Sequence, residues 1–510
     1  MSQPGFPLLS LLLWLPALGA LAILLTPPNR PRLHFAIALA ASAASFVLVL
    51  AAFVLFDRGQ PGYQFAEQFQ WIPAWGISYS LAVDGISLPI LLMGTFVAPI
   101  AVLATWNTLP ANSRTFQMLL LLLDSGMIGV LLARDIFLFY IFFEFTLIPL
   151  ALLVGIFGGA RRVEAATKFF VYTFSASIFM LLGMIGVYIL HGQQTGSYTA
   201  DYPTLLASVQ SGAFKLDTPT AAILFTLFFV GLAVKTPLWP FHTWLPPLHT
   251  EAPASGAVDL AIMLLKFGPY GMIRFNLGLF PEIAAWFAPA VGVLAAIGIV
   301  YAAVVACGQN DLKRILAYSS VSHLNFVVLG IFALNAVGIS GGVAQIVNSG
   351  LTGSALFLVV AFLYRRRSTH QLRSFGGLWK IMPVLGGLAL VAVCGSIGLP
   401  GLSGFASEYP IIQGTWLARG LGWRFAVATV IGVILAAVYL LRLFRVTFMG
   451  ELDKPENQNL PDLAPREIAQ LGLLIVPIVV FGLVPNLLYG NIAPAAERVA
   501  AGLSQALGVR

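Results

Sequence analysis

The sequence predicts an all-α polytopic membrane protein, and three observations support this fold class. Of its 510 residues, 59% are hydrophobic and only 9% are charged, which is too few charges for a water-exposed surface. The apolar runs are about 20 residues long, the length that an α-helix needs to cross a bilayer. The alternation typical of transmembrane β-strands is missing. We therefore expect helices, which satisfy their own backbone hydrogen bonds within lipid.

Hydropathy along the chain predicts about 14 transmembrane spans within a single membrane domain, residues 1–510. The first span is expected to be a retained helix, because it lacks the features of a cleaved signal peptide. The expected spans are 8–25, 35–56, 86–105, 116–132, 136–157, 166–190, 221–239, 254–275, 283–307, 315–334, 339–364, 381–413, 425–448 and 468–488. The longer polar connections, 57–80, 192–219 and 451–466, are too short to be soluble domains.

The distribution of Lys and Arg predicts the orientation of these spans. When the loop after the first span is assigned to the cytoplasm, that side receives 17 basic residues and the opposite loops receive 6. This asymmetry favours an even number of spans with both termini on the non-cytoplasmic side. It also explains much of the net charge of +7, so we expect lipids and no nucleic acid as partners of the basic residues.

Two expected spans contain clustered helix breakers. The seventh ends in Lys235-Thr236-Pro237-Leu238-Trp239-Pro240, and the twelfth contains Gly398-Leu399-Pro400-Gly401. Proline removes a backbone donor and clashes with the preceding turn, so helices 7 and 12 are predicted to be discontinuous. Non-helical backbone at membrane depth is tolerated where it lines a cavity or is buried in protein.

The spacing of the two breaks suggests an internal repeat. Pro237 and Pro400 lie 163 residues apart, which is about one five-helix unit. Residues 116–275 and 283–448 are therefore predicted to be two related five-helix repeats. Because five is odd, the second would be inverted relative to the first, an arrangement that points to an ion path at the broken helices. The alternative is two unrelated proline kinks.

Ionisable residues inside the apolar spans are the main candidates for function. A charge at the centre of a transmembrane helix costs roughly 2.5–3.5 kcal/mol, so it needs a reason to be there. Glu144, Lys235, Lys266 and Glu408 meet this description. The alternatives are a Lys235 amine that reaches toward the interface and a Glu408 carboxylate at an interfacial helix end.

Other polar residues are possible additional members of a proton path. His323 can carry a proton near neutral pH, although a single histidine in a helix bundle is often a packing residue. Asp259 precedes Lys266 by seven residues, which places both on one helix face about two turns apart. The possible additional residues are Asp124, Asp259, His242, His249 and Ser349.

These groups allow proton conduction. Burial disfavours the charged forms of a glutamate and a lysine, whereas mutual approach favours both charged forms. Opening and closing a contact between Glu144 and Lys235 would therefore change how strongly each holds its proton. No phosphate-binding loop is present, and the two cysteines, Cys307 and Cys394, lie in apolar segments, so we expect no cofactor, metal or redox centre in this chain. A partner must supply the energy.

The chain resembles the antiporter-like M subunit of the complex I and photosynthetic type I NAD(P)H dehydrogenase family. The matching stretches are Val83-Asp84-Gly85-Ile86-Ser87-Leu88-Pro89, Ala166-Thr167-Lys168, Lys235-Thr236-Pro237-Leu238-Trp239-Pro240, Leu265-Lys266-Phe267-Gly268, Ser320-Val321-Ser322-His323 and Leu399-Pro400-Gly401. They are spread over almost the whole chain. Residues 270–276 favour the M type over cation/proton antiporter subunits.

The resemblance implies site residues and partners. Glu144, Lys235, Lys266 and Glu408 would correspond to the proton-path residues of the family, with His323 in the connecting chain. The subunit would pump protons within a quinone oxidoreductase that uses NAD(P)H or ferredoxin, iron–sulfur clusters and quinone in other subunits. Its partners would be other membrane subunits, including a second antiporter-like subunit, in a bacterial inner membrane or a cyanobacterial thylakoid membrane.

The sequence departs from the family pattern at several positions. Asn348-Ser349 stands where the family usually has a histidine before Gly-Leu, and a water held by Ser349 could replace that relay step. Asp124 and Asp259 stand where uncharged residues are expected, and residues 246–251 are also changed. These departures suggest a specialised branch, such as a plastoquinone-dependent cyanobacterial form tied to carbon dioxide uptake. The alternatives to a pump are a subunit of a cation/proton antiporter and a structural membrane spacer.

Overall fold

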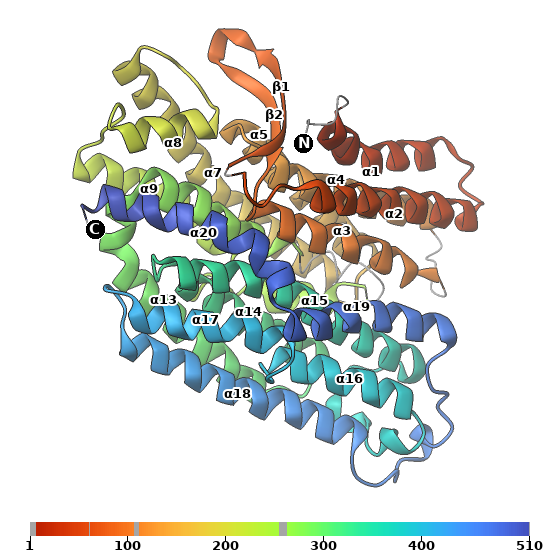
Figure 1. The fold of residues 1–510 in the computed structure, drawn as a ribbon. Helices are drawn as coiled ribbons and strands as arrows, with labels where there is room; N and C mark the ends of the chain where they lie inside the picture. The colour runs from red at the N-terminus through yellow and green to blue at the C-terminus, as the bar shows by residue number, and fades with distance from the viewer. Residues whose placement is uncertain (1–6, 61, 107–111, 254–262, 509–510) are drawn as a thin grey trace.

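Long helices lie side by side and form the bulk of the molecule (Figure 1). The computed structural model describes residues 7–60, 62–106, 112–253 and 263–508. Its first half contains α1 (Leu8–Leu25), α2 (Pro31–Leu55), β1 (Gln64–Ile72), β2 (Ile77–Val83), α3 (Ser87–Leu103), α4 (Ser113–Leu132), α5 (Ile136–Phe145), α6 (Leu147–Phe157), α7 (Arg162–Thr195), α8 (Tyr202–Ser211), α9 (Thr218–Lys235), α10 (Leu245–Glu251), α12 (Phe267–Gly271) and the π-helical turn η3 (Met272–Leu277).

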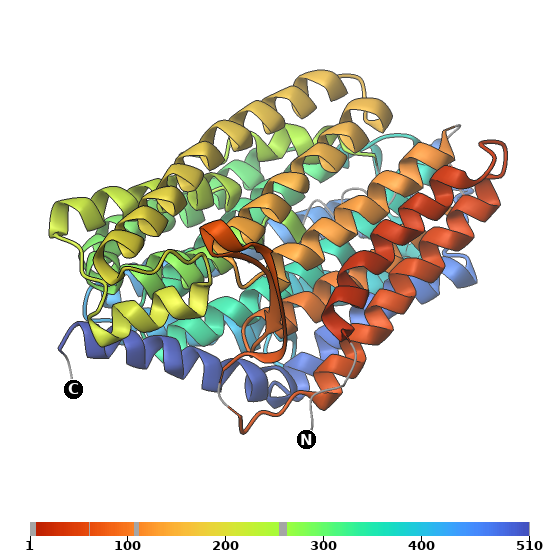
Figure 2. The ribbon, with the colours of Figure 1, turned by 90° about the horizontal axis from the view of Figure 1, so that it is seen from above.

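The second half continues with helices that pack against one another and against α9. They are α13 (Pro281–Gly308), α14 (Leu312–Ile331), α15 (Ala336–Arg367), α16 (Pro383–Ser396), α17 (Ser403–Leu417), α18 (Trp423–Phe448), α19 (Pro465–Leu483) and α20 (Asn486–Ala506). Seen from above, the long helices run in similar directions (Figure 2). The all-α membrane fold is confirmed, while the number of 14 spans and the two inverted repeats stay predictions.

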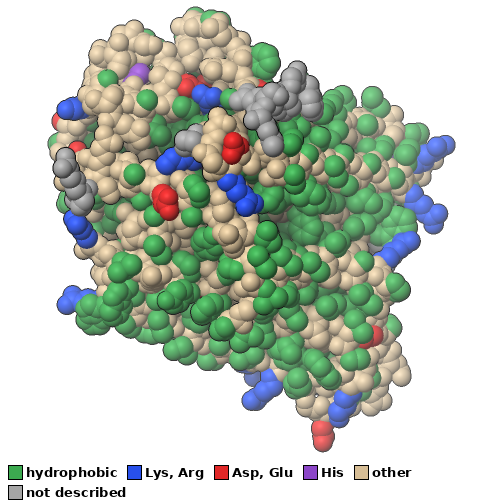
Figure 3. All heavy atoms as spheres, viewed as in Figure 1, with side chains coloured by type: hydrophobic (Ala, Val, Ile, Leu, Met, Phe, Trp, Pro, Cys, Tyr) green, Lys and Arg blue, Asp and Glu red, His purple; other side chains and the backbone are tan. Residues whose placement is uncertain are grey.

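The surface is apolar, as a lipid-facing surface requires. Among the described residues, 11 helices are long and apolar enough to cross a membrane, and α3 and α16 are shorter apolar helices. Hydrophobic side chains are dense on the right and lower parts of the face drawn in Figure 3, while Lys and Arg lie at its edges and in its upper part. Exposed hydrophobic side chains that would be a liability in water are therefore expected here.

The connection at 57–80, expected to be only polar, contains a two-stranded antiparallel hairpin of β1 and β2. The turn passes through Gly76, whose φ of 61° is left-handed, a conformation that glycine adopts without steric cost. Aromatic and β-branched residues in both strands favour this structure. The hairpin exposes Phe69, Trp71 and Trp75. Two further elements, α8 and α20, were also not expected.

The breaks predicted in helices 7 and 12 are confirmed. The chain leaves helical geometry after Lys235 at the end of α9 and re-enters a helix at α10, and a second gap separates α16 from α17. Two irregularities were missed. The span 136–157 divides into α5 and α6, because Pro149 cannot donate a hydrogen bond to the carbonyl of Phe145. The end of span 254–275 widens into η3.

Helix α15 runs through the centre of the second half. Of its most apolar 18-residue window, 94% is buried. It packs against α14, α16, α17, α19 and α20 and reaches α3 in the first half. Polar side chains on α15 are therefore enclosed by protein, where each needs an internal hydrogen-bond partner.

Candidate functional site: buried ionisable residues along the bundle

Glu144 and Lys235 lie close together in the first half but do not form a direct ion pair. Glu144 is the next-to-last residue of α5, and Lys235 is the last residue of α9. The Lys235 amine lies 4.6 Å from the centre of the Phe143 ring, which lies beside Glu144 in the sequence. Their charges are near enough to interact. Within the described residues, neither the Glu144 carboxylate nor the Lys235 amine has a hydrogen-bond partner.

Lys235 is enclosed by protein, since the residue is only 1% exposed. The break after α9 is held by Asn325 of α14. The Asn325 side chain lies 3.5 Å from the carbonyl oxygen of Pro237 and 3.4 Å from the backbone nitrogen of Trp239, as donor and acceptor respectively. The Trp244 indole donates a hydrogen bond of 2.9 Å to the carbonyl of Val234. These contacts satisfy backbone groups that the interrupted helix cannot pair.

Lys266 has a direct partner on α15. Its amine, in a residue that is 2% exposed, donates a hydrogen bond of 2.6 Å to the Ser349 hydroxyl. The Ser349 hydroxyl in turn donates to the carbonyl of Ile346, at 3.2 Å. The hydroxyl thus contacts Lys266 directly and links the first half to the central helix. A water held by Ser349 stays a prediction.

His323 and Glu408 form the best-defined cluster of the second half. Nδ1 of His323 lies 3.3 Å from Oε1 of Glu408, and the Gln345 side-chain amide donates to both atoms, at 3.2 and 3.1 Å. The other ring nitrogen of His323 lies 3.4 Å from the Ser396 hydroxyl. His323, Gln345 and Glu408 are all buried and come from α14, α15 and α17.

The break between α16 and α17 makes room for Glu408. Gly398 has a φ of 74°, and a Cβ atom at this position would lie only 2.5 Å from Oε2 of Glu408. Two features therefore require glycine at position 398: the left-handed backbone conformation and the close approach of the Glu408 carboxylate. Glu408 follows within the first two turns of α17 and is buried, which excludes an exposed carboxylate at a helix end.

His249 and His242 lie near the path but are bonded differently from His323. Both ring nitrogens of the fully buried His249 are without a hydrogen-bond partner in the described part of the chain. Lys266 and Lys313 are the cations that act on it. The Lys313 amine donates to the carbonyls of Thr250 and Ala252, at 3.2 and 2.6 Å. The ring of His242 lies 5.3 Å from that of Tyr301.

Of the two candidate aspartates, Asp124 and Asp259, the structure describes only Asp124. Asp124 is buried in α4, and neither carboxylate oxygen has a hydrogen-bond partner among the described residues. No neighbouring charge acts on it there. Asp259 lies outside the described residues.

The sequence interpretation did not include three polar residues among the candidates: Asn325, Gln345 and Asn348, the last of which was noted only as a departure from the family pattern. Asn348 donates to Oε1 of Gln345 at 2.9 Å, and its own Oδ1 accepts from the Ser403 hydroxyl at 2.6 Å. A side-chain amide in an apolar span is a signal comparable to a buried charge, because it too needs partners. This signal was available in the sequence at all three positions.

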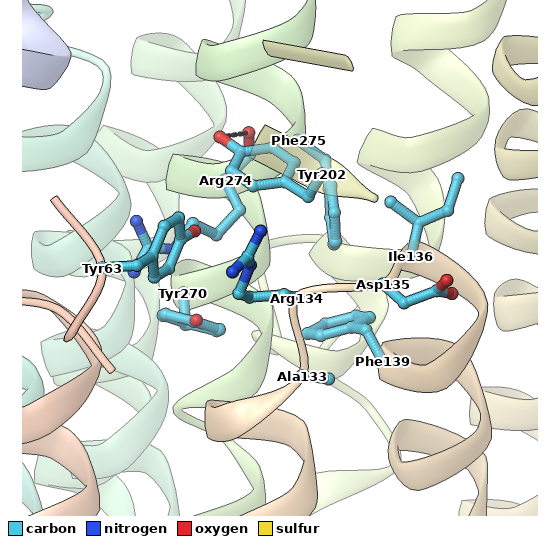
Figure 4. Close-up of a pocket in the computed structure, with 10 residues that line it drawn as sticks. All are labelled: Tyr63, Ala133, Arg134, Asp135, Ile136, Phe139, Tyr202, Tyr270, Arg274 and Phe275. Atoms are coloured by element: carbon cyan, nitrogen blue, oxygen red, sulfur yellow. Dashed lines mark hydrogen bonds between the residues drawn. The ribbon is translucent and has the colours of Figure 1, made fainter. Parts of the chain in front are cut away.

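A separate cleft lies beside the hairpin (Figure 4). Arg274 of η3 forms an ion pair of 2.5 Å with Asp84, and its guanidinium lies 5.0 Å from the centre of the Tyr270 ring and 5.6 Å from that of Tyr63. Arg134, which lines the same cleft, pairs with Asp201 at 3.0 Å. These contacts tie the hairpin to the irregular end of the Lys266 span. In the described ranges, no group of His, Cys, Asp and Glu suits a metal ion.

Comparison with known proteins places this arrangement in a family. Residues 133–436 match the family described as NADH:quinone oxidoreductase/Mrp antiporter, TM. This range includes all five predicted path residues. The chain belongs to this family. The predicted resemblance is thereby confirmed.

Relatives that match almost the whole length of the chain agree with this family. NADH-quinone oxidoreductase subunit M of Rhodobacter capsulatus is 37% identical over 518 residues, covering 98% of each chain. A chain of respiratory complex I from Thermus thermophilus is 31% identical, with a TM-score of 0.87, covering 97% of this chain and 99% of that one. A chain of the Mrp complex from Dietzia sp. DQ12-45-1b, at 21% identity and a TM-score of 0.79, shares the fold.

Proposed function

We propose that this chain is the proton-translocating, M-type membrane subunit of an NADH-quinone oxidoreductase. The observation that carries the proposal is a series of ionisable groups within one bundle: Lys235, Lys266, His323 and Glu408 are buried, and Glu144 is half-buried with both carboxylate oxygens enclosed. Ionisable groups at membrane depth are costly and mark ion or proton paths. The full-length relatives named as subunit M support the same function.

The first step would use Glu144 and Lys235. Neither group has a hydrogen-bond partner of good geometry within the described residues, so their separation would contribute, together with their burial, to the control of their charges. When they approach, each charge stabilises the other. When they separate, burial favours neutral forms and the proton of Lys235 becomes easier to release. Because the helix is broken after Lys235, a change of backbone conformation at the break would move the Lys235 side chain.

The later steps would pass through Lys266 and Ser349 to His323 and Glu408. The hydrogen bond from Lys266 to Ser349 brings the proton to α15. The cluster of His323, Gln345 and Glu408 then offers a proton-carrying imidazole beside a carboxylate. Glu408 follows the second helix break and would release the proton toward the far side. His249, on which the charges of both Lys266 and Lys313 act, would provide a water-linked entry to the path.

The energy would come from electron transfer in partner subunits. We propose NADH as the donor, quinone as the acceptor and iron–sulfur clusters in those subunits, with a second antiporter-like subunit as a membrane neighbour. The related halves, 116–275 and 283–448, would provide the two ends of the path. Helix breaks at matching places in both halves support this repeat. A ferredoxin-dependent, plastoquinone-linked thylakoid form stays a prediction drawn from the sequence departures.

The decisive experiment measures proton uptake and NADH oxidation by inverted membrane vesicles that contain the assembled complex. Glu144→Gln and Lys235→Met should lower the protons moved per NADH by the share of this subunit, and coupled turnover with it. Glu282→Gln, at an exposed position on α13, is the matched control and should leave both unchanged. Normal proton stoichiometry in both path variants would reject the proposal. Sodium-dependent proton movement without quinone would support the antiporter alternative instead.

A further inference from the structure

The carboxamide of Gln345 occupies the centre of the polar cluster in the second half. Its nitrogen donates to Nδ1 of His323 and to Oε1 of Glu408, at 3.2 and 3.1 Å, while those two atoms are 3.3 Å apart. The three atoms thus form a nearly equilateral triangle. A proton that passes between His323 and Glu408 therefore moves directly beside the N–H donor of Gln345.

The orientation of the Gln345 amide is fixed by the groups behind it. Its oxygen accepts from Asn348 at 2.9 Å and from Ser407 at 2.5 Å. In this arrangement the Asn348 oxygen accepts from Ser403 at 2.6 Å, and an ionised Glu408 carboxylate, which can only accept, requires the Gln345 nitrogen on its side. Exchanging the oxygen and nitrogen of Gln345 would place two amide donors against each other. The N–H groups of Gln345 therefore face His323 and Glu408.

This orientation favours one tautomer of a neutral His323. An imidazole nitrogen that accepts a hydrogen bond carries no proton, so Nδ1 holds its lone pair toward Gln345 while Nε2 carries the hydrogen toward Ser396. When a proton arrives at Nδ1, Gln345 loses an acceptor, and the new N–H turns to Glu408. Loading His323 at Nδ1 therefore costs the hydrogen bond from Gln345, which opposes permanent capture of the proton by the imidazole.

A cleft reaches the cluster from its outer side. Asn348, Ser403 and Ser407 line it together with Tyr489 near the start of α20. Gln345 thus stands between this cleft and the pair of His323 and Glu408. Replacing its amide would alter the pair without removing a titratable group.

We propose that Gln345 is a positioning residue that keeps Nδ1 of His323 unprotonated at rest and prevents the pair of His323 and Glu408 from trapping the transported proton. This inference rests on the proposed function of the path. Without the two N–H groups, the proton would remain shared between imidazole and carboxylate, and its onward release would be slowed.

The test uses the assembled complex in inverted vesicles. Gln345→Met keeps the length of the side chain but removes its polar groups, and Gln345→Glu keeps acceptors for Asn348 and Ser407 but removes both donors. Each should slow coupled NADH oxidation about tenfold, the factor expected for one hydrogen bond to a charged group. Thr352→Val, on the same helix, is the control, because the Thr352 hydroxyl bonds only to the backbone of Asn348 among the described residues.

A double-variant cycle separates positioning from packing. If Gln345 acts through His323, adding Gln345→Met to His323→Ala should cause no further slowing. Full additivity, or wild-type turnover of both Gln345 variants, would overturn the proposal. If Gln345→Met prevents assembly, Gln345→Glu alone decides the question. Glu144→Gln distinguishes the two failures, because it still lowers pumping when only the role of Gln345 is wrong.

Discussion

The amine of Lys266 donates a hydrogen bond of 2.6 Å to the hydroxyl of Ser349. This contact joins the irregular end of the first half to the most buried helix of the second. A serine can pass a proton only by accepting and donating at the same oxygen, whereas a histidine can hold one. The relay step at this point therefore depends on a short, well-aligned contact.

Ser349→Ala should slow coupled turnover about tenfold, because the buried Lys266 amine loses its partner on α15. Ser349→His should retain more activity, since an imidazole can accept from Lys266 and carry the proton. Ser354→Ala is the control: the Ser354 hydroxyl is buried on the same helix and has no hydrogen-bond partner in the described part of the chain. Equal turnover in Ser349→Ala and Ser354→Ala would remove Ser349 from the path.

Gly398→Ala should lower proton pumping more than Gly401→Ala. Both glycines have left-handed φ angles, 74° and 91°, so both substitutions strain the backbone. Only at Gly398 would the new Cβ approach Glu408, whereas Gly401 has open space within 4 Å. Protons moved per NADH by the two variants measure the effect of displacing the carboxylate. Identical losses would show that backbone strain alone matters.

Asp124→Leu should stabilise the protein by about 1–3 kcal/mol, the cost of burying an unpaired polar group. The reason is that neither Asp124 oxygen has a partner among the described residues. Thermal unfolding of the solubilised complex provides the measurement. Asp124→Asn should leave pumping unchanged; a loss of pumping in an intact complex would instead place Asp124 in the path.

Arg274→Met should destabilise the protein by about 3–5 kcal/mol, because it leaves the buried Asp84 carboxylate without its partner. The amount of assembled complex in the membrane and its resistance to heat are the readouts. Replacing both partners, as Arg274→Met with Asp84→Leu, should recover part of the loss. No recovery would mean that Arg274 acts mainly through the rings of Tyr63 and Tyr270.

The same ion pair should be insensitive to mild acid. Burial alone would raise the pKa of Asp84, which lies in the connection before α3, but the Arg274 guanidinium and nearby backbone donors lower that pKa overall. A carboxyl with a lowered folded-state pKa contributes stability above its unfolded pKa and loses it as the pH falls through the folded value. Thermal stability should therefore not change between pH 7 and pH 5 through this group. A difference between wild type and Asp84→Asn that disappears by pH 5 would contradict this.

Asn325→Leu should loosen the turn after Lys235. Leucine has a similar volume but cannot bond the carbonyl of Pro237 or the amide of Trp239. Hydrogen exchange of backbone amides in residues 236–241 should become faster, while exchange in α18 stays unchanged. Unaltered exchange in that turn would show that Asn325 only fills space.

Much of the fold was predictable because apolar length and helix breakers act locally. Pro237, Pro240 and Pro400 fix their interruptions by removing donors within their own segments. The hairpin and α20 were missed because both lie outside the apolar runs on which the spans were based. The π-helical turn at Arg274 could not be predicted, since its ion-pair partner Asp84 comes from a distant part of the chain.

The sequence predicted which ionisable residues form the candidate site but not which of them contact one another. Glu144, Lys266 and Glu408 stand out because a charge in an apolar span is rare. Sequence cannot show that Glu144 and Lys235 stay apart, nor that Gln345 donates to both His323 and Glu408, because these contacts depend on how separate helices face one another.

Asn325 lies two residues after His323 on α14, yet its side chain reaches the turn after Lys235 and occupies a space left by Gly298. Helix α14 therefore contacts both the turn after Lys235 and the polar cluster of the second half. Thermodynamic reciprocity then applies: whatever factor the charge of Lys235 imposes on proton affinity at His323, His323 imposes in return on Lys235. A substitution at Asn325 that changes this factor should change it equally at both residues.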